Sequence, residues 1–220
     1  MSDQGAAIHI DIYSDVICPW CYVGKRRLEG ALRQVGDAVE AKVRWRPFQL
    51  NPTMPTQGMD RKVYLETKFG SLAVFDEMEQ RLLEAGREEQ ISFAFDKIVR
   101  TPDTFPAHRL IWYAGVQGHQ DAVVEQLFKG YFEEGLDIGS SSVLIELAER
   151  AGLQATAFLE SEEGVTEVKA EESRGHGLGI RAVPYFVFDK AYGVSGAQPA
   201  EVLAAAILKA HNDVPATTER

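Results

Sequence analysis

The chain has 220 residues, of which 45% are hydrophobic and 25% charged, the usual composition of a globular protein with its own core. A net charge of −10 argues against a nucleic-acid binder or an anionic-membrane binder, because both need an excess of basic residues. Residues 1–5 lack the basic segment of a secretory signal and no run reaches the roughly 18 apolar residues of a membrane span, so we expect a cytoplasmic protein.

The first 50 residues predict a β-α-β unit. Residues 8–13 alternate between isoleucine and polar or aromatic residues, which is typical of a strand with one buried face. A C-P-W-C motif at residues 18–21 follows, and residues 22–35 carry an apolar stripe of helical period. Residues 42–50 predict a second strand, in which Pro47 favours an edge position or a bulge.

The rest of the chain predicts a helical block and then a return to strands. Residues 51–58 form a turn-rich linker, and residues 60–151 are almost entirely helical in period. Residues 183–188 and 191–194 predict two strands, and Pro199 suits the first position of a last helix. The two ends together predict one small α/β domain, with a middle segment that is too long for a loop.

The chain has only two cysteines, and two residues separate them. A disulfide between Cys18 and Cys21 would close almost no loop, so a structural staple is disfavoured. Two cysteines are too few for a structural zinc site unless histidines help, and none of the five histidines lies at zinc-finger spacing. We therefore expect no metal, and a C-x-x-C beside a strand–helix unit predicts a redox pair.

The position of the motif predicts distinct roles for its four residues. The pKa of a free cysteine thiol is about 8.5, and a helix N-terminus lowers it because it stabilises the thiolate. We therefore expect Cys18 to be the nucleophile and the less exposed Cys21 to be the resolving thiol. Pro19 fits the first helical position, and Trp20 offers an aromatic surface for docking unfolded peptides.

A second candidate element is Pro184, which ends a stretch of small residues and opens a strand. The residues alone leave two readings open. Either the Val183–Pro184 bond is trans, at a strand edge, or it is cis and frees the Val183 backbone to pair with an extended substrate.

Four blocks of sequence resemble one family in the same order along the chain. Residues 14–24, which read SDVICPWCYVG, resemble the active-site stretch of the DsbA-like thioredoxin superfamily, and the most similar branch is the FrnE-like one. Residues 105–110 resemble the helical-domain motif of this branch, residues 179–188 its cis-proline strand, and residues 194–199 the loop that follows. The branch is related to 2-hydroxychromene-2-carboxylate isomerases and kappa-class glutathione transferases.

The resemblance implies an α/β, thioredoxin-like fold with an inserted all-helical domain. Residues 1–57 and 163–220 would form the discontinuous thioredoxin-like domain, and residues 58–162 the insertion. It also implies a cis-Pro184 that faces the cysteines. The isomerase and transferase relatives usually have serine where this chain has Cys18 and lack the second cysteine, so the intact pair favours disulfide exchange.

Five further residues are candidates with ordinary alternatives beside them. Asp11 and Asp15 are candidates for a proton relay behind the cysteines, although Asp15 equally suits a turn or cap. His108 is a candidate for substrate binding or a packing residue. Ser195 and Gly196 resemble a glutathione-binding helix start, or form a simple cap.

Three functions remain in view. The first is disulfide exchange with protein or peptide thiols. The second is a glutathione-dependent isomerase or transferase that acts on a small molecule. The third is a redox sensor or chaperone-like binder that uses Trp20. We expect no tightly bound cofactor, with glutathione at most a co-substrate, and the oligomeric state stays open, a homodimer included.

Overall fold

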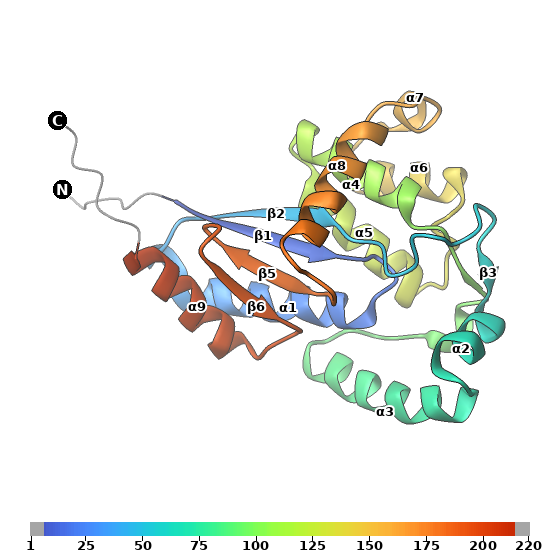
Figure 1. Ribbon diagram of the computed structural model, residues 1–220, viewed down its shortest axis with the longest axis horizontal. Coiled ribbons are helices and arrows are strands. Elements are labelled where there is room, and N and C mark those ends of the chain that lie inside the picture. The colour runs from blue at the N-terminus through green and yellow to red at the C-terminus, as the bar shows by residue number, and fades with distance from the viewer. Residues whose placement is uncertain (1–6, 214–220) are drawn as a thin grey trace.

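A four-stranded mixed sheet forms the centre of the molecule, in the order β2 (Ala41–Pro47), β1 (Ile8–Ser14), β5 (Tyr185–Phe188) and β6 (Tyr192–Ser195) (Figure 1). Strand β1 runs parallel to β2 and antiparallel to β5, which pairs in turn with β6. This computed structural model describes residues 7–213. Residues 1–5, on which part of the localisation prediction rests, lie outside them.

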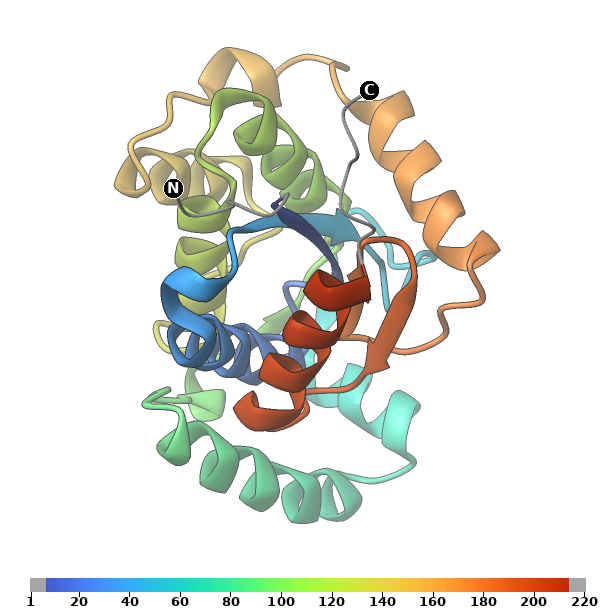
Figure 2. The ribbon, with the colours of Figure 1, turned by 90° about the vertical axis from the view of Figure 1, so that its left-hand side faces the viewer.

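Helices cover both faces of this sheet. Helices α1 (Pro19–Val35) and α9 (Ala200–Asp213) pack against one another on one face, and α8 (Val165–Gly177) crosses the other (Figures 1 and 2). The predicted alternation in β1 is confirmed, because Ile8, Ile10 and Ile12 are fully buried in the same core cluster as the residues of α1 and α9. Burial of three such side chains stabilises this layer by roughly 5 to 9 kcal/mol before chain entropy is counted.

The inserted segment consists mainly of helices. These are α2 (Arg61–Phe69), α3 (Leu72–Glu88), α4 (Phe105–Gln117), α5 (Gln120–Phe132), α6 (Ser141–Arg150) and α7 (Thr156–Leu159). Two short strands, β3 (Met59–Asp60) and β4 (Arg100–Thr101), pair beside them. The fold class is thus confirmed as a thioredoxin-like α/β fold with a helical insertion.

The insertion shares its core with the sheet domain. The ring of Tyr22 on α1 stacks on Phe128 of α5 with centroids 5.0 Å apart, and Phe132 belongs to the same cluster. Since one hydrophobic cluster runs through both parts, the boundaries predicted at 57/58 and 162/163 do not coincide with a break in the core. The two domain boundaries therefore stay a prediction.

Proline sets several element ends that the periodicity placed differently. The second strand ends at Pro47 and not at Leu50, and β5 begins at Tyr185 and not at Val183. Strand β2 ends with Pro47 opposite Ser14, the last residue of β1, and β5 begins only after Pro184, which lacks a backbone N–H for the ladder. Likewise α9 begins at Ala200, and Pro199 precedes it and accepts hydrogen bonds from the first helical turn.

Strand β2 lies at the edge of the sheet, as Pro47 predicts. On the free side of β2, the backbone N–H and carbonyl of Trp45 both have hydrogen-bond partners. The Trp45 N–H donates to Gln120 Oε1 at 2.9 Å, and Gln120 Nε2 donates to the Trp45 carbonyl at 3.2 Å. The first residue of α5 therefore completes the hydrogen bonding of this edge.

Candidate active site

The two cysteines lie where β1 passes into α1. Cys18 is the N-cap residue of α1 and Pro19 is the first helical residue, as predicted. The Cys18 N–H donates to the Asp15 carbonyl at 3.0 Å, and the Cys21 N–H donates to the Cys18 carbonyl at 2.9 Å. Both thiols are free, with Cys18 6% exposed and Cys21 fully buried, which is the order of exposure that the sequence predicts.

The loop before β5 lies directly against the cysteines. The Val183–Pro184 peptide bond is cis, and the Cys18 thiol donates to the Val183 carbonyl at an Sγ···O distance of 3.6 Å. The Gly196 N–H donates to the Pro184 carbonyl at 2.9 Å and holds the loop from its other side. A chain segment 165 residues away in sequence therefore forms one wall of the site.

Helix α1 approaches this loop closely because residue 24 has no side chain. A methyl group on Gly24 would lie 2.9 Å from Pro184 Cγ and 3.3 Å from Phe186 Cζ. We expect Gly24→Ala to lower the free energy of unfolding by about 1 to 3 kcal/mol through overpacking. The rate of disulfide exchange should fall with it, because the helix that carries the cysteines must shift.

Urea unfolding of Gly24→Ala and of Gly177→Ala tests this expectation. Gly177 is the last residue of α8, and no atom beyond its chain neighbours and its own helix backbone would lie within 4 Å of a methyl group there. The control should be as stable as the wild type or more so. Equal stability of Gly24→Ala and the control would contradict the packing argument.

The Cys21 thiol is held in its neutral form. Burial, a hydrogen bond with Cys18 and the charge of Cys18 raise the pKa of Cys21 well above its usual range. The Ser14 hydroxyl and the backbone of Asp15 hydrogen-bond to Cys21 and offset part of this effect. Cys21 therefore needs a proton acceptor before it can attack a disulfide.

A buried acid and a buried histidine lie behind the cysteines. Asp15 is fully buried and His108 is 2% exposed, and Asp15 Oδ1 lies 3.4 Å from His108 Nε2. Neither atom has a hydrogen-bond partner within residues 7–213. The other carboxylate oxygen of Asp15 accepts the Leu50 N–H at 2.7 Å, which fixes the acid in place.

Asp11, the other predicted relay acid, is placed elsewhere. Its carboxylate accepts from Arg46 Nε at 2.9 Å and lies 3.4 Å from Arg44 Nε. These side chains lie on the sheet face that α8 covers, whereas Ile10 and Ile12 face α1 and the cysteines. Strand alternation thus turns the Asp11 side chain away from the redox pair. The prediction that Asp11 relays a proton to the cysteines is therefore wrong.

The glutathione candidates are also placed differently from the prediction. Ser195 ends β6 and is exposed, and Gly196 lies four residues before α9 begins. Because the Gly196 N–H already donates to Pro184, neither residue forms a free helix N-terminus. Trp20, by contrast, is partly buried against the core beside the motif, where it borders the site.

Ser14 and Gly24 are two site residues that the sequence did not predict. Ser14 lies four residues before Cys18, and Gly24 lies one helical turn after Cys21, on the same face of α1. This spacing is the signal that could have marked Gly24. The bond from Leu50 to Asp15 joins two elements that are distant in sequence and carries no local signal.

Within residues 7–213 the structure brings no three histidine, cysteine or acidic side chains together in a way that could hold a metal ion. In the same part of the chain no helix is both long and apolar enough to cross a membrane. The titratable side chains that the structure places at the site are the two thiols, the Asp15 carboxylate and the His108 imidazole.

A family model described as the DSBA-like thioredoxin domain matches residues 9–208. The structure is similar to that of a probable DsbA oxidoreductase from Streptomyces coelicolor, with 33% identity, a TM-score of 0.88, and coverage of 97% of this chain and 94% of that one. The uncharacterized protein YwbO of Bacillus subtilis strain 168 is 28% identical over 184 residues, which cover 82% of this chain and 86% of YwbO.

A more distant structure shares the fold. The cytosolic disulfide reductase DsbM from Pseudomonas aeruginosa, solved with GSH, has 17% identity and a TM-score of 0.63, with coverage of 91% of this chain and 98% of that one. At this identity the likeness concerns the fold alone.

Proposed function

The chain belongs to the DSBA-like thioredoxin domain family, and we propose that it exchanges disulfides with protein substrates through Cys18 and Cys21. The observation that supports this most is the contact between the Cys18 thiol and the carbonyl of Val183, at 3.6 Å, beside Pro184. It puts a nucleophile next to a backbone segment that can pair with an extended peptide.

The reaction proceeds in two exchanges. The Cys18 thiolate attacks one sulfur of a substrate disulfide, so that a mixed disulfide forms and one substrate thiolate leaves. Cys21 then loses its proton and attacks the Cys18 sulfur, which releases the second substrate thiolate and forms the Cys18–Cys21 disulfide. Two electrons pass from the enzyme to the substrate, and the reverse sequence oxidises a substrate dithiol.

The second exchange depends on removing the proton from Cys21, and Asp15 is the acceptor in this proposal. Asp15 contacts Cys21 through its backbone and is the fully buried acid behind it. We expect Asp15→Asn to slow the second exchange by about 100-fold, because an amide cannot take the proton. The first exchange should keep its rate.

Stopped-flow kinetics with a fluorescent peptide disulfide separates the two exchanges as formation and decay of the mixed disulfide. Asp11→Asn is the matched control, because Asp11 faces the other side of the sheet. Equal effects of the two substitutions, or a slowed first exchange in Asp15→Asn alone, would count against this role of Asp15.

The function itself is tested by reduction of insulin in the presence of dithiothreitol. The wild type should accelerate insulin precipitation well above the uncatalysed rate. Equilibration of the Cys18–Cys21 pair with glutathione buffers then gives its reduction potential, and hence the direction of exchange in a given compartment. A wild type that does not exceed background would refute the proposal.

A glutathione-dependent reaction on a small molecule is the second candidate, and one observation favours it. The fold is similar to that of DsbM, a cytosolic disulfide reductase whose structure was solved with GSH. A cytoplasmic location of this chain belongs to the same proposal. Turnover that requires glutathione and survives loss of both cysteines would establish the second candidate in place of the first.

The chaperone-like alternative has its own readout. A variant with both cysteines replaced by serine would still suppress aggregation of an unfolding client if binding alone were the function. Disulfide exchange predicts that the same variant is inactive with insulin.

A further inference from the structure

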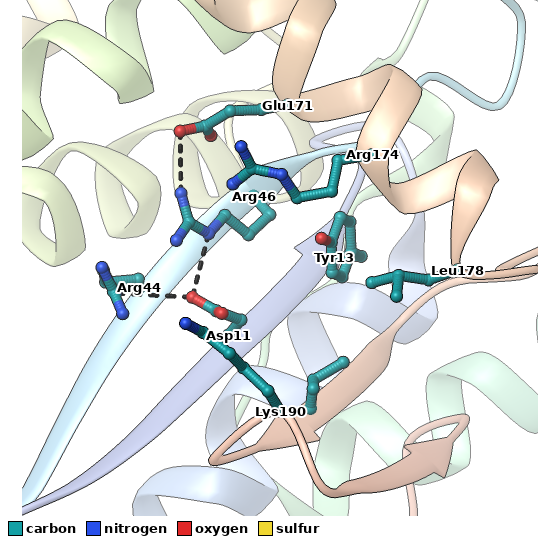
Figure 3. Close-up of a pocket in the computed structure, with 9 residues that line it drawn as sticks. Asp11, Tyr13, Arg44, Arg46, Glu171, Arg174, Leu178 and Lys190 are labelled. Carbon is teal, nitrogen blue, oxygen red and sulfur yellow. Dashed lines mark hydrogen bonds and ion pairs between the residues drawn. The ribbon is translucent and has the colours of Figure 1, made fainter.

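A cavity of about 290 Å³ lies on the sheet face opposite α1, where α8 leaves the strands (Figure 3). Strands β1, β2 and β5, helix α8 and the turn between β5 and β6 all contribute side chains to it. We propose that this pocket binds a small organic dianion, a phosphate monoester or a dicarboxylate, as a site separate from the redox pair.

The charges that line the pocket do not balance. Four cationic side chains, Arg44, Arg46, Arg174 and Lys190, face two carboxylates, those of Asp11 and Glu171. The pocket therefore carries a formal charge of +2, in a chain whose net charge is −10. Such a local excess of positive charge attracts a ligand with two negative charges.

The existing ion pairs engage only part of the positive charge. Arg46 is paired on both sides, with Asp11 at 2.9 Å and Glu171 at 2.7 Å, and Arg44 lies 3.4 Å from Asp11. Within residues 7–213 no ion pair or hydrogen bond engages the side-chain nitrogens of Arg174 and Lys190. In Figure 3 these two side chains approach the pocket from opposite sides. They are the groups free to bind an anion.

Lys190 occupies a backbone position that lysine does not favour. Asp189 and Lys190 have φ angles of +45° and +60° and form the two-residue turn between β5 and β6. Such turns prefer glycine at the second position. His9 fixes the turn, since its N–H donates to the Asp189 carboxylate at 2.7 Å and its carbonyl accepts the Asp189 N–H at 2.8 Å. The lysine is thus held over the pocket in a conformation that a glycine would adopt more easily.

The remaining walls suit a ligand with a short carbon skeleton. Tyr13 lines the pocket with its phenol, and burial and the charge of Asp11 raise its pKa, so the hydroxyl stays a donor. Val187 and the 60% exposed Leu178 supply apolar surface. A cavity of about 290 Å³ is at the lower limit for small-molecule sites and too small for a folded peptide.

Isothermal titration calorimetry at constant ionic strength tests the proposal, with inorganic phosphate, methyl phosphate, succinate and acetate as probes. We expect one dianion per chain. Arg174→Gln and Lys190→Gly should each weaken binding about tenfold or more, because each removes a charged hydrogen-bond donor. Arg33→Gln, an exposed arginine on α1, is the matched control and should bind as the wild type does.

Lys190→Gly also separates lost binding from lost folding. Its midpoint of thermal unfolding should rise, because glycine relieves the positive φ, while its affinity for the dianion falls. Tighter binding of methyl phosphate than of succinate would indicate a phosphate ester, and the reverse order a dicarboxylate. Absent binding of all dianions, acetate binding of equal strength, or equal loss in Arg33→Gln would overturn the proposal. Insulin reduction by Arg174→Gln should remain at the wild-type rate whatever the outcome.

Discussion

Replacement of Cys18 by serine is expected to reduce disulfide exchange to the uncatalysed background, a loss of roughly a thousandfold or more. Cys18 is the more exposed thiol, caps α1 and contacts the Val183 carbonyl, so in the proposed function it is the group that opens a substrate disulfide. Serine is nearly isosteric and its hydroxyl can donate to the same carbonyl, so the fold should be preserved. Insulin reduction, with circular dichroism as a check of folding, measures the effect.

Cys21→Ser separates the role of Cys21 from that of Cys18. The first exchange should proceed, because Cys18 is intact, but the mixed disulfide should persist for lack of a resolving thiol. Mass spectrometry under non-reducing conditions should show enzyme plus substrate peptide for Cys21→Ser and enzyme alone for Cys18→Ser. If instead Cys18→Ser trapped the peptide, the two cysteines would have exchanged roles.

Glu125→Gln is expected to cause the largest loss of stability among single charge removals in the buried network between α1 and α5. Burial raises the pKa of Glu125, but hydrogen bonds and charges from Arg26 and Lys25 outweigh it and lower the pKa to about 2. A fall from 4.5 to about 2 on folding corresponds to about 3 kcal/mol. Because the side chain is 17% exposed, screening reduces the expected loss to about 2 kcal/mol.

The Glu125 carboxylate also makes the free energy of unfolding fall at acidic pH. The pKa of Glu125 is lower in the folded state than in the unfolded state. Its contribution to the free energy of unfolding is therefore complete above about pH 4.5 and disappears as the pH falls towards 2. Urea unfolding at pH 7 and at several values between 4.5 and 2 should show the wild type and Glu125→Gln converging. Glu84→Gln, at an exposed position on α3, is the control and should parallel the wild type throughout. A constant difference between wild type and Glu125→Gln down to pH 2 would contradict this account.

Local patterns were sufficient for the position of the redox pair. The alternation in β1 and the proline after Cys18 together placed the first cysteine at the start of α1, and the structure has it there. The conformation of the bond before Pro184 was not decided by the residues, since a strand can begin with proline in either isomer. The family resemblance was needed to expect the arrangement that the structure has.

Two failures have physical reasons. Helix α8 was missed because only Val168 and Gly175 of its residues are buried, which leaves no apolar stripe to detect. Asp11 was retained beside Asp15 as a relay acid, although its alternation with Ile10 and Ile12 already placed it on the opposite sheet face. The pairing of Asp15 with His108 spans 93 residues of sequence, and such a contact depends on how the insertion packs.

The pairing of Gln120 with Trp45 bears on how this protein can associate. An exposed edge strand is a template on which a further strand can add, which leads to domain swapping or fibril growth. At β2 the Gln120 side chain engages both the backbone N–H and the carbonyl of Trp45, so an incoming strand finds no partner at that residue. Replacement of Gln120 by alanine would leave this position of the edge open, and addition of a further strand to β2 would then become accessible.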